Sequence, residues 1–115
     1  MRRGELLLVD LDPARAGESA KRRPAVVVSN DRANRVAAQL GRGTVTVVPV
    51  TSNIARIHPF QVLLPAADTG LRFDSKAQAE QVRAVSIGRV GSPLGRLTPE
   101  LIARLDDALR LHLDL

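Results

Sequence analysis

The pattern of apolar and polar residues along the chain predicts several short strands. Residues 5–11 are apolar and predict a first strand. Residues 25–29 contain an unbroken run of valines, which is typical of a strand in the protein core. The β-branched residues at positions 44–50 predict a third strand. Further extended segments are expected at residues 60–64 and 76–85.

Polar segments separate these predicted strands. A loop over residues 12–23 joins the first two strands, and loops of that length in a small protein are more often functional than idle. A short helical turn is expected at residues 30–36, because an Asn-Asp pair at its start can cap it. Residues 51–58 form a second loop, and residues 65–74 are rich in turn formers.

The end of the chain predicts an amphipathic helix. Thr98 can cap it, Pro99 suits its first position, and Glu100 favours the positive end of the helix dipole. Four apolar residues are expected on one face of this helix: Ile102, Leu105, Leu109 and Leu113. Short strands followed by one helix favour a mainly β fold, a small and partly closed barrel, over a parallel α/β sheet. We expect one domain over residues 1–115.

Composition narrows the possible functions. The chain has no cysteine, which excludes disulfides, cysteine-bound zinc and a thiol nucleophile. No run of eighteen apolar residues occurs, and Asp10 and Asp12 interrupt the first apolar stretch, so we expect no membrane span, no signal peptide and a cytoplasmic location. The same two aspartates could suggest a magnesium site, but a strand end running into Pro13 is the favoured interpretation, and we expect neither metal nor cofactor.

The net charge is +5, and the cations are 15 Arg and 2 Lys. Two explanations remain open: a GC-rich genome that favours arginine codons, or a polyanionic partner such as nucleic acid. Phe60 and Phe73 are the only aromatic residues, which disfavours the aromatic platforms that commonly bind single-stranded RNA. His58 is the only histidine near a predicted loop site, since His112 lies on the last helical turn.

Several short motifs occur in a fixed order: GE at residues 4–5, VDLDP at 9–13, GE at 17–18, RPAVVVS at 23–29, PVTSN at 49–53 and EQVR at 80–83. In order and approximate spacing the chain resembles the bacterial MazF/PemK toxins over nearly its whole length, with Gly95 and the terminal helix also in place. One departure is Leu7 or Leu8, where many members carry an aromatic residue.

The resemblance implies a homodimer of SH3-like barrels, the CcdB/PemK toxin fold, with a C-terminal amphipathic helix. It implies a metal-independent endoribonuclease that cuts single-stranded RNA at short specific sequences and is silenced by an acidic antitoxin. By motif, the arginine and threonine implicated in cleavage fall on Arg23 and Thr51, and Glu18 is the best candidate for the general base. The expected RNA-binding residues are Lys21, Arg22, Ser52, Asn53, Glu80, Gln81 and Arg83.

The chemistry of RNA cleavage agrees with these assignments. A proton must leave the 2′-hydroxyl, negative charge on the phosphorane must be stabilised, and the departing 5′-oxygen must be protonated. The permanently charged Arg23 suits the second role, although a surface arginine in the 21–23 basic run is the alternative. Thr51 could bind a phosphate oxygen or the 2′-hydroxyl, or could simply terminate a strand. The general acid stays open.

Two other interpretations stay open for Glu80 and for the function. Glu80 could act as base or align Arg23, but a strand carboxylate paired with Arg83 is favoured. The alternative function is a non-enzymatic toxin of the same fold that binds DNA gyrase, because fold alone does not separate the two. A nucleic-acid-binding barrel without catalysis is the third possibility.

Overall fold

The computed structural model describes residues 1–12 and 21–115. Its strands are β1 (Glu5–Asp12), β2 (Lys21–Val27), β3 (Thr44–Thr51), β4 (Gln61–Leu64), β5 (Ser75–Gln78), β6 (Arg83–Ser86) and β7 (Val90–Arg96). Its helices are α1 (Asp31–Leu40), α2 (Ala66–Thr69) and α3 (Pro99–Leu113), with 3-10 turns η1 (Ala79–Gln81) and η2 (Ile87–Arg89). None of the helices in these ranges is long and apolar enough to cross a membrane.

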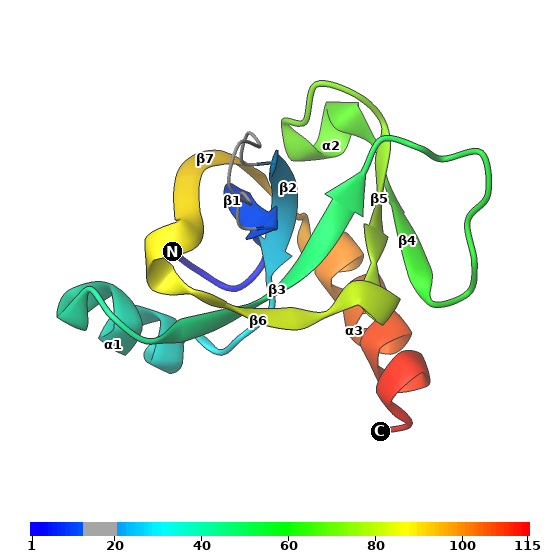
Figure 1. Cartoon of the computed structure of the whole chain (residues 1–115). Coiled ribbons are helices and arrows are strands. Elements are labelled where there is room, and N and C mark those ends of the chain that lie inside the picture. The colour runs from blue at the N-terminus through cyan, green and yellow to red at the C-terminus, as the bar shows by residue number, and fades with distance from the viewer. Residues whose placement is uncertain (13–20) are drawn as a thin grey trace.

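The strands form an antiparallel sheet in the order β4-β5-β3-β2-β1-β7, and β6 pairs with β3 beside β5 (Figure 1). Strand β3 is central because it pairs with β2 along one edge and with β6 and then β5 along the other. This architecture confirms the predicted mainly β class with a C-terminal helix.

Alternating residues of the central strands fill two separate cores. Val48 on β3 belongs to the core that α3 covers, whereas the adjacent Val47 belongs to a second core on the other side of the sheet. Ala37 of α1 contributes to the second core. Since successive side chains of a strand point to opposite faces, odd-numbered residues of β3 share the face of the second core.

Helix α3 begins as the sequence predicts. The Thr98 hydroxyl oxygen accepts a hydrogen bond from the Leu101 backbone N at 3.2 Å, and Pro99 occupies the first turn. The expected apolar face was partly wrong, because Leu105 is buried but Leu113 is 48% exposed. The predicted Ile102 and Leu109 pack half-buried against the same core, and Leu101 and Ala108, which were not predicted, are buried as well.

Other boundaries differ because tertiary pairing decides them. The predicted loop over residues 12–23 ends sooner, since residues 21–24 pair with β1 as part of β2. The expected extended segment at 76–85 is interrupted by η1, and β7, which pairs with β1, was not predicted. Helix α1 is longer than the expected turn and ends at Gly41, whose φ of 64° is left-handed.

Candidate active site

Arg23 and Thr51, the two residues expected to cleave RNA, lie on neighbouring strands. The recorded register of β2 with β3 runs from Val27 opposite Val47 to Ala25 opposite Pro49. Continuing it by two residues places Arg23 opposite Thr51, and opposite residues of an antiparallel pair share one face. Both side chains are half-buried. The continued register therefore brings the two positions to the same end of β2 and β3, although 27 residues separate them in the sequence.

The Thr51 hydroxyl takes part in the turn that follows β3. Its oxygen accepts a hydrogen bond from the Asn53 backbone N at 3.2 Å, and the Asn53 side-chain oxygen accepts one from the Ala55 backbone N at 3.3 Å. These bonds are the strand-ending turn that the sequence allowed. A hydroxyl that accepts one hydrogen bond still has its proton to donate. Thr51 can therefore terminate the strand and, at the same time, donate a hydrogen bond to a phosphate oxygen.

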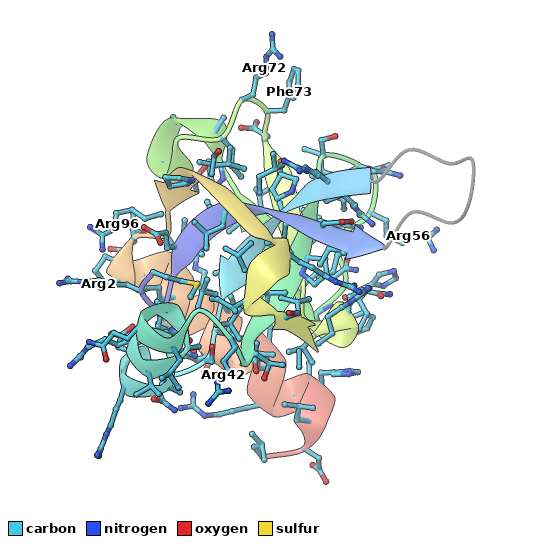
Figure 2. All side chains as sticks on the ribbon, turned by 60° about the vertical axis from the view of Figure 1, so that its left-hand side comes forward. Arg2, Arg42, Arg56, Arg72, Phe73 and Arg96 are labelled. Carbon is cyan, nitrogen blue, oxygen red and sulfur yellow. The ribbon has the colours of Figure 1, made fainter. Side chains whose placement is uncertain are left out.

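Ser52 and Asn53 are both exposed at the start of the β3–β4 loop, which we define as residues 52–60. Arg56 in the same loop is exposed, and Figure 2 shows its side chain extending away from the body of the protein. The loop thus offers polar and cationic groups next to Thr51 without burying them.

Arg22 does not share the face of Arg23. Arg22 is exposed and lies opposite Asp10 on β1, so strand alternation puts it on the other face of β2 from Arg23. Lys21 is paired opposite Asp12 in the backbone register. Glu18 lies outside the described residues.

Arg83 lies on β6 opposite Val47, and therefore shares the face that carries Thr51. Its guanidinium donates to the backbone oxygen of Gln81 at 3.4 Å and to the Gln81 side-chain oxygen at 3.3 Å. These contacts fix the direction of Arg83 at the start of β6. The structure therefore brings Gln81 and Arg83 together, a contact that the sequence did not predict.

Glu80 belongs to the turn η1 rather than to a strand, which corrects the expectation of a strand carboxylate. One of its carboxylate oxygens accepts a hydrogen bond of 2.7 Å from the Gln61 side-chain nitrogen. Its other oxygen, Oε1, is buried without a hydrogen bond within the described ranges. Among the described residues no hydrogen bond joins Glu80 to Arg23, so the structure does not bring these two groups together.

Two site features were not found by sequence reasoning. Lys76 lies opposite Thr51 on β5 and is only 8% exposed, and Gln61 on β4 is equally buried. Neither belongs to a motif, and the only sequence signal was that a single lysine stands in an otherwise arginine-rich downstream segment. Within the described residues no group of three or more His, Cys, Asp or Glu is arranged to hold a metal ion.

The two histidines lie at the end of the β3–β4 loop and on the last turn of α3. His58 stacks on Phe60 with ring centroids 5.1 Å apart and planes 7° from parallel, at the end of the β3–β4 loop. His112 is exposed on the last turn of α3. The arrangement therefore centres on a fixed positive charge and a hydroxyl, a combination suited to binding and polarising a phosphodiester.

The chain is similar to known toxins over nearly its whole length. A family model described as the PemK-like, MazF-like toxin of type II toxin–antitoxin systems matches residues 2–113. The chain is 63% identical over 115 residues to endoribonuclease MazF9 of Mycobacterium tuberculosis, covering 100% of this chain and 98% of the relative. It is 29% identical over 116 residues to endoribonuclease EndoA of Bacillus subtilis, covering 100% and 96%.

A solved structure has the same fold. It is an endoribonuclease in complex with its cognate antitoxin from a mycobacterial species, with a TM-score of 0.79 and 25% sequence identity. The superposition covers 100% of this chain and 96% of the solved chain.

Proposed function

Since the chain belongs to the PemK-like, MazF-like toxin family, we propose that this endoribonuclease cuts single-stranded RNA at a short specific sequence and without a metal ion. The observation that carries the proposal is the register of β2 with β3, which, continued by two residues, places Arg23 opposite Thr51 beside an exposed polar loop. A non-enzymatic gyrase-binding toxin is not favoured, because the relatives are named endoribonucleases.

The proposed reaction is an internal transfer. The ribose 2′-oxygen attacks the adjacent phosphorus, its proton passes to a base, and the bond from phosphorus to the 5′-oxygen breaks as that oxygen takes up a proton. The products are a 2′,3′-cyclic phosphate and a 5′-hydroxyl. Arg23 stabilises the extra negative charge on the phosphorane, and the Thr51 hydroxyl donates a hydrogen bond to a phosphate oxygen.

The two carboxylates, Glu18 and Glu80, have different roles in this proposal. We assign the general base to Glu18, on the family resemblance alone. Glu80 is engaged by Gln61, so we assign it to orienting the end of the β3–β4 loop rather than to taking a proton. Lys21, Ser52, Asn53, Gln81 and Arg83 contact RNA in this proposal. Arg22 lies on the opposite face of β2 from Arg23, so it contacts RNA outside the cleavage site.

The chemical route is tested with an RNA oligonucleotide that is cleaved at one site. We expect cleavage in excess EDTA, products with 2′,3′-cyclic phosphate ends, and loss of cleavage when a single deoxyribose replaces the ribose 5′ of the cut. The matched control moves that deoxyribose three nucleotides away, where cleavage should persist. Efficient cutting of the deoxy substrate, or a requirement for divalent metal, would contradict the proposed mechanism.

We also propose a cytoplasmic homodimer held silent by an acidic antitoxin. The charge of +5 supports such a partner, because an acidic disordered segment would be attracted to a basic surface and would order on binding. The similar mycobacterial endoribonuclease was solved with its cognate antitoxin, which supports the same class of partner here.

A further inference from the structure

Lys76 is a charged residue in a place where charged residues are rare. It is 8% exposed and lies in the middle of a three-strand segment, opposite Thr51 on β3 and opposite Leu63 on β4. Lysine is almost never fully buried unless its amine has a partner, because removing the charge from water is costly. The burial of Lys76 therefore needs a compensating contact.

That contact is with the β3–β4 loop. The Lys76 amine donates a hydrogen bond of 2.5 Å to the backbone oxygen of Arg56, 20 residues earlier in the chain. The guanidinium of Arg56 itself extends outward, as Figure 2 shows, so it is the main chain of Arg56 that is held. A charged donor makes this bond stronger than a bond between neutral groups.

The same loop is also attached at both ends. At its start, the Thr51 hydroxyl accepts a hydrogen bond from the Asn53 backbone N, and the Asn53 side-chain oxygen accepts one from the Ala55 backbone N. At its end, the Gln61 side chain accepts from the His58 backbone N at 3.1 Å and donates to Glu80 at 2.7 Å. Lys76 supplies the attachment in the middle, where the loop has no strand partner in the described register.

We propose that Lys76 is a positioning residue of the RNA-cleaving site: it holds the β3–β4 loop so that Ser52, Asn53 and Arg56 stay beside Thr51. This inference rests on the proposed function. Lys76 does not touch RNA in this arrangement, because the residue is only 8% exposed and its amine is bonded to a backbone oxygen. An apolar side chain would be cheaper to bury at this position, so the amine is explained by the loop that it fixes.

The test uses the variant Lys76→Met, which keeps the length of the side chain and removes the donor. Hydrogen exchange of the unliganded protein should show the amides of Asn53, Ala55 and His58 exchanging roughly tenfold faster than in the wild type, because the loop opens more often. With RNA, KM should rise roughly tenfold while kcat changes less than about threefold, because the loop contributes binding contacts.

The matched control is Arg72→Met. It removes the same charge from an exposed residue that projects beside Phe73, far from Arg56 in Figure 2. Exchange in the β3–β4 loop and KM should stay within about twofold of the wild type in this control. The variant Lys76→Arg retains a charged donor and should recover most of the lost affinity for RNA.

Three results would overturn the inference: loop exchange in Lys76→Met within twofold of the wild type, an unchanged KM, or an equal rise of KM in Arg72→Met. If Lys76→Met does not fold, Lys76→Gln, a shorter neutral donor, is measured against the same criteria. The exchange measurement needs no RNA. A wild-type protein that never cleaves RNA would therefore contradict the proposed function, while loop exchange would still test the Lys76 contact.

Discussion

At the scale of single residues, the candidate site depends on side chains with two roles. Thr51 terminates β3 through its hydroxyl oxygen and retains a proton for a phosphate. The PVTSN motif singled out Thr51 as a candidate, and the RPAVVVS motif singled out Arg23. Lys76 could not be predicted, because a lysine in a strand is usually a solvated residue and its burial depends on a loop 20 residues away.

The role of Thr51 is tested by comparing Thr51→Ala with Thr51→Ser. Removing a hydrogen bond to a charged group costs about 1.5–3 kcal/mol, so Thr51→Ala should lower kcat roughly 10- to 100-fold. Serine keeps the hydroxyl, and Thr51→Ser should stay within about threefold of the wild type. Single-turnover cleavage measures both. Equal losses in the two variants, or no loss in Thr51→Ala, would mean that the hydroxyl does not act on the phosphate.

At the scale of elements, local signals and tertiary pairing determined different parts of the fold. The cap at Thr98 and Pro99 is local, and α3 was predicted with the correct start. Strand β7 was missed because Gly91, Pro93 and Gly95 interrupt its apolar pattern, and pairing with β1 creates it. A Cβ on Gly95 would lie 1.9 Å from the Thr69 backbone oxygen, a contact that no local pattern reveals.

Packing of α3 on the sheet is tested with two leucines of the same helix. Leu105 is 2% exposed, so Leu105→Ala leaves a cavity and should lower the free energy of unfolding by about 2–5 kcal/mol. Leu111 is 59% exposed, and Leu111→Ala should change the free energy of unfolding by less than about 0.5 kcal/mol. Chemical denaturation measures both. Similar values for the two variants would contradict the packing of α3 described here.

At the scale of the whole molecule, the sheet order assembles a site from distant parts of the chain. Because β3 lies between β2 and β5, residues 23, 51 and 76 come from three adjacent strands. The charge of +5 gives this surface a general attraction for RNA, which affects binding of every sequence alike. Sequence patterns predicted the mainly β class and singled out Arg23 and Thr51, whereas the placement of the three positions on adjacent strands depends on strand order, which no local pattern contains.

The most direct test of the account is the single-turnover rate of RNA cleavage by Arg23→Lys, with RNA affinity measured separately on a substrate that lacks the reactive 2′-hydroxyl. Lysine keeps the charge but loses the planar, forked donor, and a preorganised donor at such a site contributes about 3 kcal/mol. We therefore predict a loss of roughly 100-fold in rate with affinity within about threefold of the wild type. A rate within twofold of the wild type would contradict the assignment of Arg23 to the scissile phosphate.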